Sequence, residues 1–397
     1  MQHVPEISAP ELVAKIHARP VPIVLAVAGG GSRAIAELLE VPGSSRTVLE
    51  AVVPYSPNAM AGWLGSRPDQ FCSAATARAM AVRAFIRARE LLGNTSRTGA
   101  GIACTASLAT DRVKRGSQRA HVAAQMLERT VTDSIEFFAS QRTRRDEEGV
   151  LTAMLLNIVA ECCALEERLP LGLLVEEEVV RTVTEAPSEW QALLMGSIDA
   201  ERHGSAGTAG QASSGTQSTS QTGAAIFPGA FNPLHDGHRR MAEVAEQILG
   251  VPVAFEISII NVEKPPLDYT AMEERQMQFG AERTLWFTRA PTFDDKSRTF
   301  PGATFIVGAD TLARIADECY YEHSADRRDA AIARLRERGC KFLVFGRTLE
   351  GTFQRLQDFN IPTPLRAICQ EVPASEFRED VSSTELRRAI VEDEPLS

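Results

Sequence analysis

A segment of twenty residues, Gly204 to Gly223, contains only Gly, Ser, Ala, Thr and Gln and divides the 397-residue chain near its middle. It has no charge and no large apolar side chain, so it cannot bury enough surface to offset the entropy of ordering it. We expect a flexible tether with an r.m.s. span of roughly 25 Å. Because structureless loops this long are uncommon within compact domains, the segment predicts two domains, one on each side.

Both halves alternate between strand-like and helix-like patterns, which favours an α/β fold for each domain. In the second half, apolar runs predict strands at 224–227, 253–260, 303–307 and 341–345. Apolar residues at helical spacing predict a helix over 238–249, directly after the first of these strands. The pattern is typical of a parallel, Rossmann-like sheet, in which ligands bind beyond the carboxyl ends of the strands.

The composition excludes several classes of protein. A formal net charge of −10 argues against a nucleic-acid partner, which would favour a basic face. The seven cysteines form no CxxC pair, which argues against a zinc ribbon or disulfide framework and predicts reduced thiols in the cytoplasm. The apolar run 21–28 is too short for a membrane span and predicts a buried strand, so no membrane partner is expected.

A loop with two histidines connects the first strand of the second half to its first helix. Gly229 permits a tight exit from the strand, Pro233 stiffens the loop, and Gly237 leaves room at the start of the helix. The amides and dipole at a helix start attract anions, and the imidazoles of His235 and His238 can donate hydrogen bonds to phosphate oxygens. A solvated turn or half of a metal site is the alternative interpretation of two histidines alone.

The wider pattern of this loop, GAFNPLHDGH, resembles the signature of the HxGH nucleotidyltransferase superfamily. Its form is similar to that of adenylyltransferases that make NAD from nicotinamide mononucleotide. Near the C-terminus, the stretch VSSTELR at 381–387 resembles the ISSTxxR segment that lines the ATP phosphates in these enzymes. Alternatively, Ser382 and Glu385 form a simple capping box at the start of a last helix.

The resemblance implies roles for further residues, with their ordinary structural roles as alternatives. Gly308 to Asp310 resembles a GAD segment near the nucleotide, and Lys264 follows the second strand, where it could neutralise a phosphate. The expected catalytic residues are His235, His238, Arg387 and Lys264. The expected nucleotide-binding residues are Gly229, Ala230, Phe231, Gly237, Gly308, Asp310, Ser382, Ser383 and Thr384. Candidates for stacking on a substrate ring are Trp286, Tyr320 and Tyr321.

In the first half, residues from about 22 to 162 resemble the CinA C-terminal domain family, whose members hydrolyse the amide of nicotinamide mononucleotide. The matching stretches are LEVPGSS at 39–45, VPYSPN at 53–58 and ARAMA at 77–81. The family's catalytic serine falls on Ala28 and its lysine on Met60, so the chemistry of a nucleophile is missing.

We therefore expect this half not to be an active amidohydrolase. Ser32 lies four residues from the nucleophile position and could in principle substitute for it. The glycines at 29–31 could still bind an anionic ligand. Alternatively, the domain serves assembly, including that of a homo-oligomer.

The expected organisation is a CinA-like α/β domain at 5–165, a connecting segment at 166–203, the linker at 204–223 and the nucleotidyltransferase domain at 224–391. The expected reaction transfers AMP from ATP, accompanied by Mg²⁺, to a phosphorylated acceptor, most favourably nicotinamide mononucleotide. No protein side chains are expected to form a metal site. Cytidylyl transfer, or adenylyl transfer to phosphopantetheine or to a sugar or alcohol phosphate, stays open. A non-catalytic nucleotide sensor is the alternative of another class.

Overall fold

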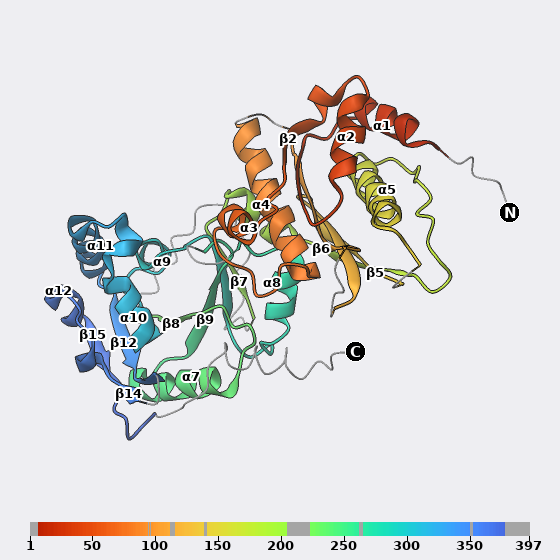
Figure 1. Ribbon diagram of the computed structural model, residues 1–397. Coiled ribbons are helices and arrows are strands. Elements are labelled where there is room, and N and C mark those ends of the chain that lie inside the picture. The colour runs from red at the N-terminus through yellow and green to blue at the C-terminus, as the bar shows by residue number, and fades with distance from the viewer. Residues whose placement is uncertain are drawn as a thin grey trace. The chain divides into compact units, whose positions relative to one another are not determined.

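The computed structural model describes residues 7–93, 95, 97–111, 116–138, 141–204, 223–261, 265–349 and 352–377. The chain divides into two compact units (Figure 1). The N-terminal unit consists of residues up to 195 together with the described part of 262–273, and the C-terminal unit contains the rest. Each unit is an α/β structure, which confirms the predicted fold class. Residues 205–222 of the expected linker lie outside the described residues.

The N-terminal unit is built on a six-stranded mixed sheet with the order β2-β1-β3-β4-β5-β6. Strand β1 pairs in parallel with β2 and β3, and the other neighbours are antiparallel. Helices α3 and α4 cover one face, while α1, α2 and α5 cover the other (Figure 1). The strands are β1 (Ile23–Ala28), β2 (Val48–Val52), β3 (Ala100–Ser107), β4 (Gln118–Gln125), β5 (Arg129–Phe137) and β6 (Val179–Glu185), and the helices are α1 (Ala9–Ala18), α2 (Ser32–Glu40), α3 (Pro57–Leu64), α4 (Ala74–Leu92), α5 (Arg144–Cys162) and α6 (Ser188–Met195).

Strand β1 explains why this sheet needs helices on both faces. All six of its residues are buried, as the apolar run predicts. Its side chains alternate between two hydrophobic surfaces: Val27 packs in the cluster with α1, α2 and α5, whereas Ala28 packs in the cluster with α3 and α4. A strand covered on both sides reads as a continuous apolar run rather than an alternating one.

The C-terminal unit is built on a seven-stranded sheet with the order β15-β12-β11-β8-β9-β10-β7. All neighbours are parallel except β7, which runs antiparallel to β10. The strands are β7 (Ala200–His203), β8 (Ala225–Pro228), β9 (Val253–Ser258), β10 (Leu285–Thr288), β11 (Thr304–Gly308), β12 (Lys341–Phe345) and β15 (Cys369–Glu371), with a separate hairpin of β13 (Arg347–Leu349) and β14 (Thr352–Gln354). The helices are α7 (Asp236–Leu249), α9 (Phe293–Thr299), α10 (Ala309–Ala316), α11 (Ala325–Glu337) and α12 (Thr363–Arg366). Helix α8 (Tyr269–Gln276) has its residues up to Glu273 in the N-terminal unit and the rest in the C-terminal unit.

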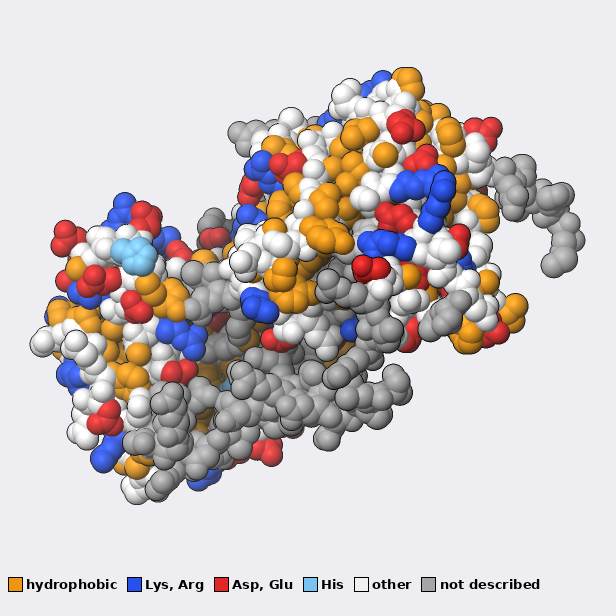
Figure 2. Space-filling model, viewed as in Figure 1, with side chains coloured by type: hydrophobic (Ala, Val, Ile, Leu, Met, Phe, Trp, Pro, Cys, Tyr) orange, Lys and Arg blue, Asp and Glu red, His pale blue; other side chains and the backbone are white. Residues whose placement is uncertain are grey.

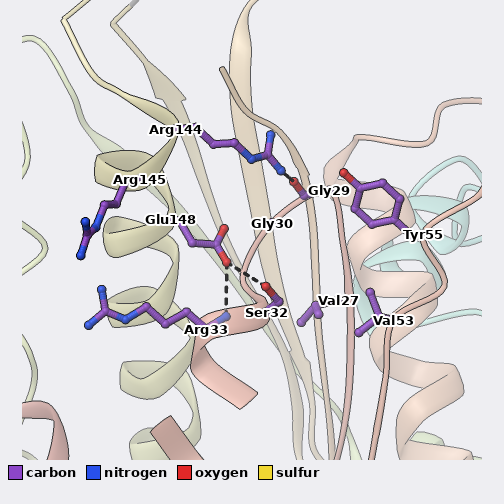
Figure 3. Close-up of a pocket in the computed structure, with 10 residues that line it drawn as sticks. All are labelled: Val27, Gly29, Gly30, Ser32, Arg33, Val53, Tyr55, Arg144, Arg145 and Glu148. Atoms are coloured by element: carbon purple, nitrogen blue, oxygen red, sulfur yellow. Dashed lines mark hydrogen bonds between the residues drawn. The ribbon is translucent and has the colours of Figure 1, made fainter. Parts of the chain in front are cut away.

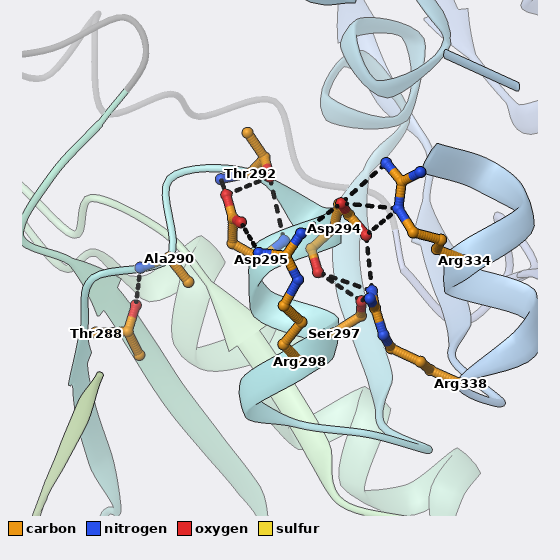
Figure 4. A network of polar contacts seen from close by, with 9 residues as sticks. All are labelled: Thr288, Ala290, Thr292, Asp294, Asp295, Ser297, Arg298, Arg334 and Arg338. Atoms are coloured by element: carbon orange, nitrogen blue, oxygen red, sulfur yellow. Dashed lines mark hydrogen bonds and ion pairs between the residues drawn. The ribbon is translucent and has the colours of Figure 1, made fainter. Parts of the chain in front are cut away.

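A charged cluster fixes helix α9 to helix α11 (Figure 4). The Asp294 carboxylate accepts hydrogen bonds from Arg334 Nε at 3.0 and 3.1 Å and from Arg338 at 2.7 Å. Arg338 also donates to Ser297 Oγ at 2.6 Å. Burial alone would raise the pKa of Asp294, but the hydrogen bonds from Arg334 and Arg338 hold that pKa below its ordinary value. The cluster therefore joins α9, which lies between β10 and β11 in sequence, to α11, which lies between β11 and β12.

The expected connecting segment at 166–203 is not merely a connection. Its strand β6 is the edge of the N-terminal sheet, and its strand β7 is the edge of the C-terminal sheet. Leu285 of β10 pairs with His203, and Thr288 pairs with Ala200. These pairings join residues about eighty positions apart, and the local periodicity of a sequence does not report such contacts.

Charged side chains of both signs are interspersed on the face of the described residues that Figure 2 shows. This agrees with a sequence that holds 42 basic and 52 acidic residues. Within the described ranges, no helix is both long enough and apolar enough to cross a membrane.

Candidate functional site

The order of the C-terminal strands places the two-histidine loop at a switch point of the sheet. The chain passes from β8 to β9 on one side, and β11 lies on the other side of β8. Ala225 of β8 pairs in parallel with Thr304 of β11, so both strands end at the same edge of the sheet. Ligands of open parallel sheets bind in the crevice beyond the strand ends at such a point. The loop after β8 and the Gly308–Asp310 turn after β11 therefore lie at the same edge of the sheet, where we expect a ligand to bind.

The loop after β8 turns around a buried phenylalanine. The backbone N–H of Gly229 donates to the carbonyl oxygen of Glu256 at 2.9 Å, which ties the loop to β9. Phe231 has a φ of 42° and folds its ring back, so a Cβ at Gly229 would lie 2.5 Å from that ring. Gly229 is therefore required by packing, since any side chain there would displace the ring.

The side chain of Phe231, which we expect among the nucleotide-binding residues, is only 2% exposed. The ring packs edge-on against Phe227, Phe255 and Phe279, with centroid distances of 5.3, 5.2 and 5.6 Å. An aromatic side chain in such a cluster is part of the core. Only the backbone of Phe231 remains available to contribute to the loop.

The two histidines stack at the start of α7. His235 is the residue that precedes the helix, and His238 lies in its first turn. Their ring centroids are 3.7 Å apart with an interplanar angle of 27°. The His235 backbone N–H donates to Nδ1 of His238 at 3.3 Å. Since Nδ1 accepts this hydrogen bond, the proton of neutral His238 resides on Nε2. The Phe231 ring lies edge-on to His238 at 5.0 Å and supports its orientation.

Two side chains that the sequence analysis did not predict as site residues form hydrogen bonds with the backbone of the loop. Gln278 accepts from the Leu234 backbone N–H at 2.6 Å and donates to the Phe231 carbonyl oxygen at 3.1 Å. Arg275 Nε donates to the Ala230 carbonyl oxygen at 3.1 Å. Gln278 therefore bridges two points of the loop with one amide group. No motif marks these residues, because their partners are backbone atoms more than forty positions away.

The turn after β11 places a carboxylate at the same edge of the sheet as the histidine loop. Gly308 precedes helix α10, and Asp310 lies in the first turn of that helix. A Cβ at Gly308 would lie 2.6 Å from Asp310 Oδ1, so the glycine leaves room for this carboxylate. Arg314 forms an ion pair with Asp310 at 3.2 Å. Gly308, rather than Asp310, occupies the capping position, which corrects the alternative role of Asp310 as a helix cap.

The three aromatic candidates for substrate stacking lie in β10 and in a short 3-10 helix. Trp286 is within β10, where it packs edge-on to Phe300 at 5.5 Å beside the hydrophobic core. Tyr320 and Tyr321 belong to a short 3-10 helix at Glu318–Tyr321. The hydroxyl of Tyr321 donates to the Ile315 carbonyl oxygen at 3.0 Å, and burial raises the pKa of Tyr321. Trp286 and Tyr321 thus have partners within the C-terminal unit, and substrate stacking stays a prediction for the three residues.

Several expected site residues cannot be placed. Lys264, Ser382, Ser383, Thr384 and Arg387 all lie outside the described residues. Their roles stay predictions from the resemblance. Gly237 is buried in the first turn of α7, as close packing at that position requires.

The N-terminal unit has a cavity of about 680 Å³ beyond the end of β1 (Figure 3). Arg144 donates to the Gly29 carbonyl oxygen at 2.9 Å at its edge. Glu148 accepts from the Gly31 backbone N–H at 2.9 Å, and from Ser32 Oγ and the Arg33 backbone N–H at 3.3 Å each. The lining residues are Val27, Gly29, Gly30, Ser32, Arg33, Val53, Tyr55, Arg144, Arg145 and Glu148.

The Glu148 carboxylate therefore already occupies the glycine-rich loop that we expected to hold an anion. It bonds to the first residues of α2, where an anionic ligand would otherwise be favoured. An external anion would have to displace this carboxylate. Gly29 also cannot change, because a Cβ there would lie 1.9 Å from the carbonyl oxygen of Ala106.

The two positions that correspond to the family's serine and lysine are part of the hydrophobic core. Ala28 and Met60 are 4% and 3% exposed and belong to one cluster of buried residues. A methyl group and a thioether can neither attack a carbonyl group nor activate a nucleophile. Both side chains contribute to the packing between the sheet and helices α3 and α4.

We expect the intact chain to release no ammonia from nicotinamide mononucleotide, because the Ala28 position lacks a nucleophile. A coupled ammonia assay on the full-length protein measures this directly. Sustained turnover that is abolished by Ser32→Ala would contradict the prediction and would identify Ser32 as the replacement nucleophile. Because Ser32 already donates its hydroxyl to Glu148, we expect no such activity.

Comparisons with known proteins find matches in both halves of the chain. Residues 226–389 match a family model described as cytidylyltransferase-like. The N-terminal part is similar to the competence/damage inducible protein CihA from Agrobacterium tumefaciens, at 21% identity over 40% of this chain and 96% of that one, with a TM-score of 0.31. It is also similar to a competence-damaged protein (CinA) superfamily protein from Enterobacter cloacae, at 18% identity over 40% and 96% of the two chains, with a TM-score of 0.33. No curated protein matches the chain.

The histidine loop and the parallel strands β9 to β12 lie within the residues that match this model. The match to a cytidylyltransferase-like model supports a nucleotidyltransferase activity in general for this part of the chain.

Proposed function

We propose that the C-terminal domain transfers AMP from ATP to nicotinamide mononucleotide, forming NAD and releasing pyrophosphate. The observation that carries this proposal is the stacked pair of His235 and His238 at the start of α7, after the strand β8 at which the order of the sheet switches. Imidazole N–H groups and helix-start amides at one point suit a dianionic or polyanionic ligand. The form of the loop, GAFNPLHDGH, supports the adenylyl donor and the pyridine nucleotide acceptor.

The reaction needs no protein nucleophile. An acceptor phosphate oxygen forms a bond to the α-phosphorus of the triphosphate, and the bond from that phosphorus to the β-bridging oxygen breaks, with pyrophosphate as the leaving group. The protein contributes position and charge stabilisation. His238 would donate from Nε2 to a phosphate oxygen at the transferring centre, and the stacked His235 would hold the neighbouring phosphate.

Residues outside the described ranges complete the proposal. Arg387 and the amides of Ser383 and Thr384 would hold the β- and γ-phosphates, and Lys264 would neutralise the transferred phosphate. Mg²⁺ would accompany ATP, held by phosphate oxygens and water rather than by a protein cage. In the ranges that the structure describes, no three His, Cys, Asp or Glu side chains gather into such a cage. The ion would add positive charge where the triphosphate develops negative charge.

A second donor has its own support. The matching family model is described as cytidylyltransferase-like, so CTP with a phosphorylated acceptor is the alternative pairing for the same site. Both pairings use the same chemistry at the α-phosphorus, and the base pocket alone would distinguish them.

A pyrophosphate-release assay on the full-length protein tests the proposal. ATP and CTP are each combined with nicotinamide mononucleotide, phosphopantetheine, a sugar phosphate and an alcohol phosphate, with Mg²⁺ present. We expect the highest kcat/KM for ATP with nicotinamide mononucleotide. Preference for CTP or for another acceptor would replace the proposed substrates but keep the reaction. If every pair fails to release pyrophosphate, the proposed function is wrong.

A further inference from the structure

Both polar atoms of the Gln278 amide are hydrogen-bonded within the C-terminal unit. Oε1 accepts from the Leu234 backbone N–H at 2.6 Å, and Nε2 donates to the carbonyl oxygens of Phe231 at 3.1 Å and Glu274 at 3.3 Å. An amide turned the other way would bring Nε2 against the Leu234 N–H and Oε1 against two carbonyl oxygens. The three contacts therefore fix both the position and the orientation of this side chain.

Gln278 is itself anchored to the core beside the histidine loop. Its backbone N–H donates to the Arg275 carbonyl oxygen at 3.1 Å. Phe279, the next residue, is 6% exposed and packs against Phe231 and Phe255 with ring centroid distances of 5.6 and 4.9 Å. Because close packing fixes the residue next to it, Gln278 provides a rigid support for the loop.

A series of contacts leads from Gln278 to the imidazole of His238. Leu234, whose N–H donates to Gln278, directly precedes His235 in sequence. The His235 N–H in turn donates to Nδ1 of His238 at 3.3 Å, which places the proton of the neutral imidazole on Nε2. This distance is at the long end for a hydrogen bond, so a small displacement of the loop would break it. The tautomer of His238 therefore depends on the position of the Leu234–His235 backbone.

Other contacts hold the start of the same loop. The Gly229 N–H donates to the Glu256 carbonyl oxygen at 2.9 Å, and Arg275 Nε donates to the Ala230 carbonyl oxygen at 3.1 Å. Gln278 holds the loop further along, at the residue before His235. Removing the Gln278 amide should therefore leave the start of the loop in place and loosen the part that orients His238.

We propose that Gln278 is a positioning residue of the transferase, which holds the Leu234–His235 backbone so that Nδ1 of His238 accepts the His235 N–H and Nε2 carries the proton. That proton is the one that His238 would donate to a phosphate oxygen. The inference rests on the proposed function for its effect on rate, whereas the tautomer of His238 can be measured without any substrate. Gln278 acts through the backbone and is not itself a catalytic residue.

The test compares glutamine substitutions in the full-length protein. Gln278→Met keeps the length of the side chain but removes both its acceptor and its donor. Gln278→Glu keeps an acceptor for the Leu234 N–H and removes the donor to the Phe231 carbonyl oxygen. Gln276→Met is the matched control, because Gln276 is a half-buried glutamine two residues earlier, and its Nε2 lies 3.0 Å from Nε2 of His203.

Two quantities are measured for each variant. The nitrogen-15 chemical shifts of the His238 imidazole report its tautomer at alkaline pH, where imidazoles are neutral, and His238→Ala assigns the signals. The kcat and KM of pyrophosphate release report the effect on the reaction. Thermal unfolding checks that each variant is folded, and Gln278→Glu decides the question where Gln278→Met does not fold.

We expect Gln278→Met to convert His238 from one tautomer to a mixture and to lower kcat about tenfold with KM within about twofold, since small displacements of a catalytic group are costly. Gln278→Glu should retain more of the wild-type tautomer and lower kcat about threefold, because it keeps the bond to Leu234. Gln276→Met should change neither quantity.

Wild-type imidazole shifts in Gln278→Met, or a kcat within about twofold of the wild type, would overturn the proposal. Where only Gln278→Glu folds, unchanged shifts and kcat in that variant would overturn it. Equal effects of Gln276→Met and Gln278→Met would also overturn it, because the cause would then be general destabilisation. If the wild type releases no pyrophosphate, the proposed function fails, while the imidazole shifts still decide whether Gln278 sets the tautomer of His238.

Discussion

Replacing His238 by alanine is expected to lower the kcat of nucleotidyl transfer by about 10²- to 10³-fold, with a smaller change in KM. The loss follows from removing a fixed hydrogen-bond donor from the centre where negative charge develops. Nδ1 of His238 accepts the His235 backbone N–H at 3.3 Å, and the Phe231 ring lies against the imidazole at 5.0 Å. These contacts fix the ring before substrate binds, so its loss affects the transition state more than binding.

The matched control is His323→Asn, at an exposed histidine of the same unit. Its φ of 55° is one that asparagine tolerates, so the substitution should not strain the backbone. Steady-state pyrophosphate release gives kcat and KM for both variants, and thermal unfolding checks that both are folded. A folded His238→Ala protein with kcat within twofold of the wild type would remove His238 from the mechanism.

Replacing Lys296 by methionine is expected to lower the free energy of unfolding of the C-terminal unit by about 3–5 kcal/mol, because it leaves a buried carboxylate without its counter-charge. Lys296 Nζ donates to both oxygens of Glu256 at 2.8 Å and to the Ala290 carbonyl oxygen at 2.8 Å. The Glu256 and Lys296 side chains are 0% and 8% exposed. Thr288 Oγ1 supplies one further donor at 2.5 Å, which cannot neutralise the charge.

Two further variants separate this effect from a loss of packing. Arg298→Ala breaks ion pairs of a side chain that is 59% exposed, and it should cost about 1 kcal/mol or less. The double variant Lys296→Met with Glu256→Gln should recover much of the loss, because no buried charge remains. Urea unfolding measures all three. A Lys296→Met protein as stable as Arg298→Ala would show that the buried pair is not the main anchor of β9 and α9.

The same pair bears on the site through the backbone of β9. The carbonyl oxygen of Glu256 accepts the Gly229 N–H at the start of the histidine loop. Lys296 holds the side chain of Glu256 in place. The main chain of the same residue holds the start of the loop. The sequence shows Glu256 only as a charged residue within an apolar run, and its partner lies forty positions away.

The sequence predicted those parts of the fold that depend on the pattern of neighbouring residues. Strands 225–228, 253–258, 304–308 and 341–345 and the helix from 236 lie within a few residues of their predicted positions. The loop from Gly229 to His238 was recognisable because its glycines, proline and histidines are contiguous. Phe231 was assigned to the nucleotide because a motif gives the order of residues but not which side chains are buried.

The parts that the sequence did not predict depend on distant partners. Strand β7 joins the C-terminal sheet only through β10, and residues 265–273 group with the N-terminal unit through Arg78, Thr130 and Thr184. Gln278 and Arg275 bind backbone atoms, for which any polar side chain of suitable length would serve. Such contacts depend on the tertiary structure, so neither periodicity nor a motif identifies them.

The most direct test of a nucleotidyltransferase in the C-terminal unit follows the α-phosphorus of the donor. The full-length protein is incubated with Mg²⁺, nicotinamide mononucleotide and ATP labelled at either the α- or the γ-phosphorus, and the products are separated. The proposal predicts that the α-label enters the dinucleotide and the γ-label appears in pyrophosphate, with both transfers lost in His238→Ala. Entry of the γ-label into the acceptor, or no label transfer to any phosphorylated acceptor from ATP or CTP, would contradict it.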